Sequence, residues 1–161
     1  MRPCLIFRRL LTGCFLLLAV VYGYGAEGSA LVVTTTSVLG AAVRAVSGDR
    51  VAVETLLPPG SCPGHFDLEP SQVRRLRAAS LFFRHDFQGF LDSRLLANGM
   101  DRGEIAVIQT EGGLCVPGTF ASLGRAVAER LAEKFPGDAA TFRARADALE
   151  QEAKSRGQAM Q

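Results

Sequence analysis

The chain turns at Leu57-Pro58-Pro59-Gly60-Ser61-Cys62-Pro63-Gly64-His65. Two prolines and a glycine end the apolar run 51–57, so a buried strand stops there and a loop begins. A thiol and an imidazole follow within four residues, and Pro70 stands where it can begin the next helix. Soft and borderline donors on a loop after a strand suit a transition metal better than a hydrolytic centre.

The first thirty residues have the pattern of a secretory leader. Residues 1–9 carry three arginines and no acid, residues 10–22 are almost wholly apolar, and small residues are frequent over 23–30. The apolar run is shorter than the ~20 residues that span a bilayer. We therefore expect residues 1–30 to be a signal peptide and the remainder to be periplasmic or otherwise extracytoplasmic. Leu11-Thr12-Gly13-Cys14 resembles a lipid-attachment box, but it precedes most of the apolar core, so a lipid anchor is the alternative.

Composition limits the chain to one modest domain and disfavours nucleic acid as a partner. It has 161 residues, 48% of them hydrophobic, and a formal net charge of +2. Three of its 18 basic residues lie in residues 1–9, so no basic field remains for nucleic acid or an anionic membrane. Cys62 and Cys115 are the cysteines beyond the leader. In an oxidising compartment they could form a disulfide, or Cys62 could bind a metal ion.

Strand and helix patterns alternate along the rest of the chain. Apolar and β-branched runs predict strands at 31–36, 51–57, 81–83 and 105–108, with helical spacing between them. This alternation predicts an α/β fold with a four-stranded parallel sheet flanked by helices over residues 31–118. Residues 119–161 have helical spacing, broken at Pro136-Gly137, and are expected to form a long helical segment.

Local signals predict where individual helices begin and end. Ser37 is expected to cap the first helix, and Gly48 to end it. Asp86 is expected to cap the helix after the third strand, whose inner side carries Phe87, Phe90, Leu91 and Leu95. The last helix carries an apolar stripe that no fifth strand would cover, so we expect the stripe to be exposed and a second lobe to be missing. Its residues are Phe142, Ala146, Leu149 and Ala153.

The candidate site lies at the carboxyl ends of the predicted strands, where ligands bind in parallel sheets. Cys62 and His65 follow the second strand, His85 ends the third, and the loop after the fourth carries Glu111 and Cys115. Neutral imidazole binds several transition metals, and a thiolate favours zinc. We predict that His65, His85, Cys62 and Glu111 are donors to a divalent transition metal, with Cys115 as a less direct candidate.

Several segments also carry a family resemblance. They are Val33-Thr34-Thr35-Thr36-Ser37-Val38-Leu39, Gly48-Asp49-Arg50-Val51, Leu57-Pro58-Pro59-Gly60, Pro63, Pro70-Ser71 and residues 78–83. In these the chain resembles the solute-binding proteins of metal-ion ABC transporters, which carry zinc and manganese. The resemblance implies a non-enzymatic protein whose amino-terminal lobe is joined by a long helix to a second lobe. It also implies delivery of the ion to a membrane ABC permease.

The resemblance further implies a metal site between the lobes, with two ligands from each. The family usually has Asp-Pro-His after the Pro-Pro-Gly turn, and that His is its first ligand. Here the same columns hold Cys62-Pro63-Gly64, and the imidazole is displaced to His65. The second ligand is usually a His before the long helix, where the best alignment places Gly112. Neither ligand carries over, so the predicted site is the rearranged donor set given above.

Other functions remain as alternatives. Cys62-Pro63-Gly64-His65 resembles a thiol-redox motif whose second Cys is replaced, which suggests a periplasmic thiol oxidoreductase using Cys62. That chemistry needs the Cys at a helix N-terminus, whereas the expected helix begins near Pro70. A non-functional gene fragment is the other alternative. The sequence has no Gly-x-Ser-x-Gly elbow and no P-loop, which argues against hydrolase and nucleotide-binding functions.

The expected ligand is zinc, with manganese as the alternative, and it is bound for transport. The expected partners are an ABC permease in the membrane and a separately encoded second lobe, without nucleic acid.

Overall fold

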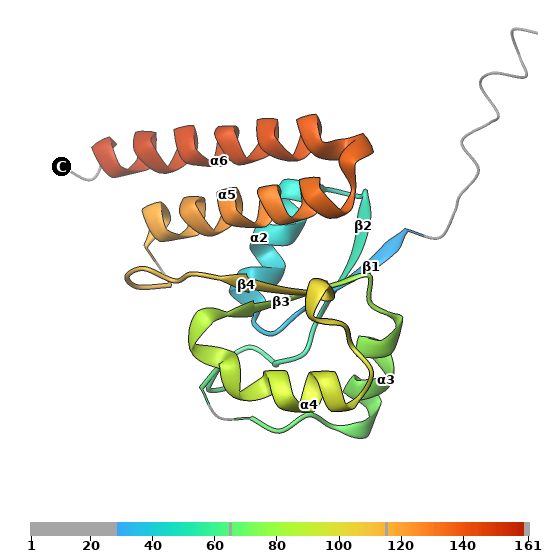
Figure 1. Ribbon diagram of the computed structural model, residues 1–161. Helices are drawn as coiled ribbons and strands as arrows, with labels where there is room; N and C mark the ends of the chain where they lie inside the picture. Colours follow the sequence, from blue (N-terminus) through green and yellow to red (C-terminus); the bar gives the residue numbers. More distant parts are fainter. Residues whose placement is uncertain (1–28, 65, 115, 160–161) are drawn as a thin grey trace, which may run out of the picture.

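A computed structural model describes residues 29–64, 66–114 and 116–159 as a three-layer α/β fold (Figure 1). Its sheet has four strands in the order β2-β1-β3-β4, and every pairing is parallel. The strands are β1 (Ala30–Thr34), β2 (Val51–Thr55), β3 (Leu81–His85) and β4 (Ile105–Ile108). The predicted four-stranded parallel sheet is therefore confirmed.

Helices cover both faces of the sheet (Figure 1). One face carries α2 (Ser37–Ser47), α5 (Pro117–Lys134) and α6 (Ala139–Ala159). The other face carries α3 (Pro70–Ala78) and α4 (Asp92–Ala97). Three short 3₁₀ helices complete the described elements, at Asp86–Leu91, Arg102–Glu104 and Pro136–Asp138. None of the described helices is long and apolar enough to cross a membrane.

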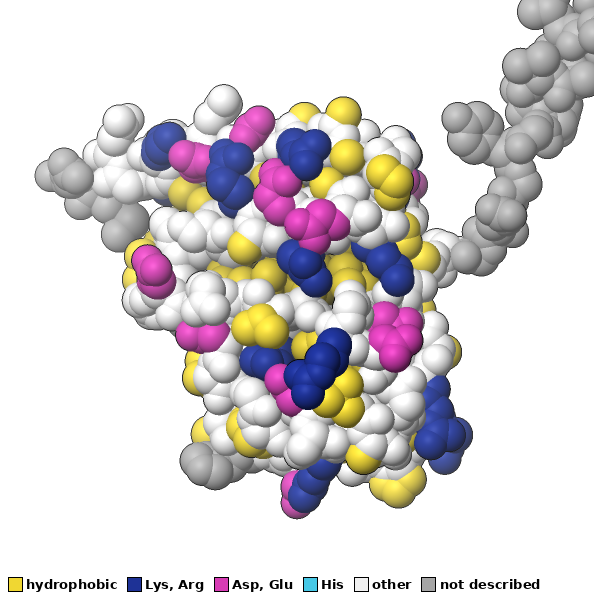
Figure 2. Space-filling view, viewed as in Figure 1, with side chains coloured by type: hydrophobic (Ala, Val, Ile, Leu, Met, Phe, Trp, Pro, Cys, Tyr) yellow, Lys and Arg dark blue, Asp and Glu magenta, His cyan; other side chains and the backbone are white. Residues whose placement is uncertain are grey.

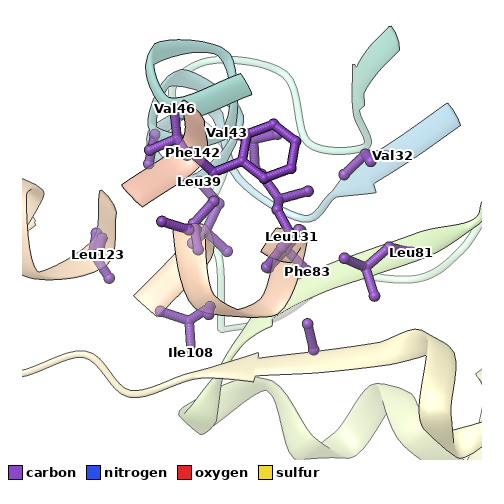
Figure 3. Packing of buried hydrophobic residues seen from close by; sticks show 14 of the residues in the cluster. Val32, Leu39, Val43, Val46, Leu81, Phe83, Ile108, Leu123, Leu131 and Phe142 are labelled. Carbon is purple, nitrogen blue, oxygen red and sulfur yellow. The ribbon is translucent and has the colours of Figure 1, made fainter. Parts of the chain in front are cut away.

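The larger core lies between the sheet and the layer of α2, α5 and α6 (Figure 3). Apolar side chains from several elements are fully buried in this core. They include Phe142 of α6, Leu131 of α5, Leu39 and Val43 of α2, and Phe83 of β3. Burying a large apolar side chain contributes roughly 1.5–3 kcal/mol, so this layer holds α6 firmly to the rest of the chain.

The smaller core lies on the opposite face of the same strands. Val33 and Phe82 follow Val32 and Leu81 in β1 and β3, and successive strand residues point to opposite faces. They pack with Leu76 of α3 and residues around α4, which include Leu91, Leu95 and Met100. Apolar residues on both faces explain why the strands lack polar alternation.

The helix ends agree with the sequence signals at Gly48 and Pro70 but not at the cap of the first helix. Gly48 ends α2 with φ of 61° and donates its N–H to the carbonyl of Arg44. Pro70 begins α3 as predicted. The cap of α2 is Thr36, whose hydroxyl accepts from the N–H of Leu39 at 3.3 Å, so the prediction of Ser37 was wrong by one residue.

The segment after β3 differs from the prediction. Residues Asp86–Leu91 form a 3₁₀ helix with non-helical angles at Gln88, and His85 occupies the cap position expected for Asp86. Phe87 and Phe90 are 47% and 46% exposed, so their predicted inward orientation was wrong. The tighter winding of a 3₁₀ helix rotates the side chains relative to an α-helix, and it directs Gln88 inward in place of the two phenylalanines. Leu91 and Leu95 are buried, as predicted.

The apolar stripe of α6 is largely covered. The helix lies antiparallel beside α5, and Phe142 and Ala146 are buried against α2 and α5 (Figure 1). Leu149 and Ala153 are half-buried, so the expectation of a fully exposed stripe was wrong. The outer surface of the pair carries ion pairs such as Arg125 with Asp147 and Glu150, and Figure 2 shows basic and acidic side chains mixed over this layer.

Candidate functional site

The carboxyl ends of the strands gather polar side chains at one edge of the sheet. Thr35 and Thr36 follow β1, His85 ends β3, and Thr110 follows β4. Because β3 lies between β1 and β4, these residues come from three adjacent strands. The chain after β2 is joined to the same edge, since the N–H of Leu57 donates to the carbonyl of Thr35 at 3.0 Å.

His85 lies fully buried at the centre of this edge. Its Nε2 is 3.0 Å from the hydroxyl of Thr36, and its Nδ1 is 2.7 Å from the hydroxyl of Thr110. Phe87 stacks on the ring, with a centroid distance of 5.0 Å and an interplanar angle of 9°. Both ring nitrogens are therefore already hydrogen-bonded, so His85 could bind a metal only if one hydroxyl moved away.

Burial keeps the His85 ring neutral. It lowers the pKa of His85 to about 4, and the neighbouring Asp86 carboxylate offsets this only in part. A neutral imidazole has one N–H and one bare nitrogen, so one threonine hydroxyl donates to the ring and the other accepts from it. Hydroxyls can take either role, and this pair therefore satisfies either tautomer of the ring.

Gln88 connects three segments at the same edge and is also fully buried. Its Oε1 accepts from the Thr35 hydroxyl at 2.6 Å and from the His85 backbone N–H at 3.0 Å. Its Nε2 donates to the carbonyl of Pro63 at 2.8 Å. The loop that carries the predicted donor Cys62 is thereby joined to the ends of β1 and β3.

Arg84 stabilises the end of β3 on the opposite face. Its guanidinium is bidentate on Asp92, with Nε–Oδ1 and Nη2–Oδ2 distances of 2.7 Å, and Nη1 donates to the carbonyl of His85 at 2.9 Å. Because the side chain of Arg84 is only 7% exposed, the Asp92 carboxylate compensates a nearly buried charge. This ion pair attaches the start of α4 to the end of β3.

The two acids after the Pro-Pro-Gly turn contact the helices on that face. Asp67 forms an ion pair with Arg94 of α4. Glu69 is the N-cap of α3, and its backbone N–H donates to Oε1 of Gln72 at 3.0 Å. The carboxylate of Glu69 thus lies at the N-terminus of α3, where the helix dipole favours negative charge. Neither acid contacts the polar cluster around His85.

The predicted metal donors are only partly placed. His65 and Cys115 lie outside the described residues, so the geometry of His65 and the Cys62–Cys115 disulfide stay predictions. Cys62 is exposed on the loop between β2 and α3, and Glu111 is exposed after β4. In the part of the chain that the structure describes, no three His, Cys, Asp or Glu side chains are grouped to hold a metal ion.

Surface hollows lie beside this edge and away from it. A shallow hollow on the loop side is lined by Gly64, Phe66, Asp67 and Phe90, and Phe66 packs edge-on against Phe90 with centroids 6.0 Å apart. Two further grooves lie between the first turns of α5 and the end of α6, and none of the predicted donors is among the described residues that line them.

Sequence reasoning missed Gln88 and the threonine hydroxyls. Gln88 is three residues after His85, which is the spacing of a capping pair, and that spacing was the available signal. The contacts from Thr36 and Thr110 to His85 span 49 and 25 residues, so no local pattern indicates them.

Comparison with known proteins matches this arrangement to one family. Residues 32–119 match the family model described as ZnuA, zinc-uptake complex component A, periplasmic. A metal ABC transporter substrate-binding lipoprotein, FimA of Streptococcus parasanguinis, is 32% identical over 59 residues, which are 37% of this chain and 19% of FimA.

Solved structures share the fold. Zn(II)-bound AdcA of Streptococcus pneumoniae aligns with a TM-score of 0.68 and 20% identity, covering 82% of this chain and 32% of AdcA. A crystal structure of ZnuA gives 0.69 and 18%, covering 81% of this chain and 56% of ZnuA. A Mn-bound periplasmic metal-binding protein of Candidatus Liberibacter asiaticus gives 0.64 and 12%, covering 76% and 52%. This chain therefore spans about half or less of the length of these proteins.

Proposed function

Since the chain belongs to the family of periplasmic zinc-uptake complex component A, we propose that it captures a divalent transition metal ion for delivery to an ABC permease in the membrane. The family and the structural neighbours are solute-binding proteins and not enzymes, as expected from the sequence. They are metal-binding substrate-binding components of ABC transporters, and the family is extracytoplasmic.

The observation that carries the proposal is the position of loop 58–64. This loop, which leads from the Pro-Pro-Gly turn toward the predicted donor His65, is hydrogen-bonded to Gln88 at the carboxyl edge of the sheet. Ligands of parallel sheets bind beyond that edge. The polar ends of three adjacent strands lie beside the loop, and they provide a rigid support on which a metal-binding loop can be held.

We assign the donor roles in a definite order. His65 comes first because it follows the held Pro63 by two positions. Exposed Cys62 and Glu111 can supply a thiolate and a carboxylate, unless Cys62 is joined to Cys115. His85 comes last because both of its nitrogens are hydrogen-bonded to threonines. Imidazole with thiolate favours zinc over manganese, which prefers oxygen donors.

The wider assembly is also part of the proposal. Residues 1–30 act as an export signal, residues 31–118 form the metal-binding lobe, and residues 119–161 begin the connection between lobes. A separately encoded second lobe supplies the remaining ligands. The fold match to longer relatives, of which this chain covers 52% and 56%, supports this division.

Zinc titration of the metal-free protein tests the donor assignment. We expect His65→Ala to weaken zinc binding by about tenfold or more, because it removes the leading donor. Asp67→Asn is the matched control on the same loop, since Asp67 pairs with Arg94, and it should bind zinc within about twofold of wild type. Unchanged binding by His65→Ala would refute the assignment.

Elemental analysis of protein purified from its extracytoplasmic compartment identifies the ion. We expect zinc in the wild-type protein and much less in His65→Ala. Protein that folds but carries no metal in either form would favour the gene-fragment alternative. The thiol-oxidoreductase alternative is not retained, because Cys62 lies eight residues before the start of α3 at Pro70 and the family is not enzymatic.

A further inference from the structure

Gln88 is a buried polar side chain that the proposed donor set does not include. It is fully inaccessible, and its amide contacts Thr35 after β1, His85 of β3 and Pro63 of loop 58–64. These residues are 53, 3 and 25 positions away in sequence. One side chain therefore joins the site loop to the two central strands.

The chemistry of its partners determines how the amide is oriented. The backbone N–H of His85 can only donate, so it requires the oxygen of the Gln88 amide. The carbonyl of Pro63 can only accept, so it requires the nitrogen. Rotating the amide by 180° would place donor against donor and acceptor against acceptor. The Thr35 hydroxyl also donates to Oε1, but the orientation does not depend on it, because the His85 N–H and the Pro63 carbonyl already fix both ends of the amide.

Loop 58–64 has few other anchors. Among its described residues, the hydrogen bond from Gln88 to Pro63 is the one that joins it to another part of the described chain. The bond from the Ser61 N–H to the Pro58 carbonyl, 3.2 Å long, is internal to the loop. Gly60 has a φ of 85°, and neither Gly60 nor Gly64 has neighbouring atoms within 4 Å of where a Cβ would lie.

We propose that Gln88 is a positioning residue for metal capture, holding loop 58–64 against the carboxyl edge of the sheet. This inference rests on the proposed function for its metal-binding consequence, while the hold on the loop is a separate physical claim. A loop fixed before the ion arrives loses less conformational entropy on binding, and this preorganisation raises affinity. Gln88 touches the loop backbone and is not itself proposed as a metal donor.

Gln88→Glu separates the loop contact from the other two. The ionised carboxylate can still accept from Thr35 and from the His85 N–H, but it has no hydrogen to donate to the Pro63 carbonyl. Because a buried carboxyl can keep its proton at pH 8, both measurements are repeated with Gln88→Met, which has no donor at any pH. Thr35→Val is the matched control, because it removes a buried hydroxyl from the same amide and leaves the bond to Pro63. Gln88→Met is a second variant, of similar size and without a donor, should Gln88→Glu fail to fold.

Two measurements decide the inference. Zinc affinity should fall by about tenfold or more in Gln88→Glu and stay within about twofold in Thr35→Val. Loop motion can be followed with Ser61→Trp, because the chain has no tryptophan of its own and Ser61 is exposed. In the metal-free protein, the fast component of the tryptophan anisotropy decay should grow when Gln88→Glu is added and not when Thr35→Val is added.

The outcomes distinguish this inference from the proposed function. Zinc binding by the wild type together with unchanged affinity and anisotropy in Gln88→Glu would overturn the role of Gln88 alone. Equal losses in Gln88→Glu and Thr35→Val would also overturn it, since the cause would then be general damage to the buried cluster. If the wild type binds no zinc, the proposed function fails with the metal-capture role, and the anisotropy still decides whether Gln88 holds the loop.

Discussion

His85 shows at the residue scale how a candidate ligand becomes part of the core. Its position at the end of a strand is the same as in the prediction, but the hydroxyls of Thr36 and Thr110 take both of its nitrogens. Phe87 covers one face of the ring. A histidine that is buried and hydrogen-bonded in this way joins three strand ends whether or not a metal is present.

The low pKa of His85 predicts a stability that decreases on mild acidification. The pKa falls from 6.5 to about 4 on folding, so the unfolded chain takes up a proton between these values that the folded chain does not. The contribution of neutral His85 to the free energy of unfolding is fully present above pH 6.5 and is lost as the pH falls toward 4. From pH 7.5 to 5, urea unfolding in EDTA should show a loss of about 2 kcal/mol from this group.

His85→Gln is the control for this effect. Glutamine does not titrate, and it can still hydrogen-bond the two hydroxyls. All other titratable groups are the same in the two proteins, so the difference between their pH profiles isolates His85. Parallel profiles for the two proteins over this range would contradict the prediction.

At the scale of elements, the apolar stripe of α6 is buried by packing against α5 and α2. The helix turns back beside α5 after the short Pro136–Asp138 segment, which places Phe142 and Ala146 against α2 and α5. Gly124 of α5 permits a close approach, since a Cβ there would lie 3.0 Å from Cδ1 of Leu149. Burial decreases along the helix from Phe142 to Leu149.

The decrease in burial along α6 predicts that replacing its side chains by alanine lowers the free energy of unfolding by unequal amounts. Phe142→Ala should lower the free energy of unfolding by about 3–5 kcal/mol, because it leaves a large cavity in the main core. Leu149→Ala should cost less because that side chain is only half-buried, and Gln151→Ala on the exposed side should change stability by about 0.5 kcal/mol or less. Denaturant melts measure all three, and equal losses at 142 and 149 would show that α6 packs differently.

At the scale of the whole molecule, the described residues form one lobe with an open edge. The chain covers 56% of ZnuA and 32% of AdcA, and its described part groups no three potential donors. A metal ion held at this edge would keep water molecules at the coordination positions for which the lobe supplies no ligand. Affinity should therefore be limited by the number of protein ligands.

This open edge predicts weak zinc binding by the 161-residue chain alone. Isothermal titration should give a dissociation constant of about 1 µM or weaker, corresponding to about 8 kcal/mol or less. Adding a separate chain that supplies the second lobe should tighten binding. Single-site nanomolar affinity without a partner would contradict the proposed division of ligands between lobes.

The sequence by itself determined the order and type of the main elements, the parallel sheet and the family resemblance. These follow from local signals, such as the β-branched runs, Pro70 at the start of α3 and Gly48 at the end of α2. The carboxyl edge could also be predicted, because parallel strands in an α/β fold bring their ends together. A property that depends on neighbours in sequence can be deduced from the sequence.

Only the tertiary structure decided what the residues at that edge contact. His85 is hydrogen-bonded to two threonines, Gln88 is hydrogen-bonded to Pro63, and Phe142 packs in the main core. Each of these contacts joins segments that are distant in sequence. The inward direction of Gln88 depends on the 3₁₀ winding after β3, which an α-helical period does not predict. Such contacts arise from packing of the whole chain, since the free energy of burying each group depends on what surrounds it.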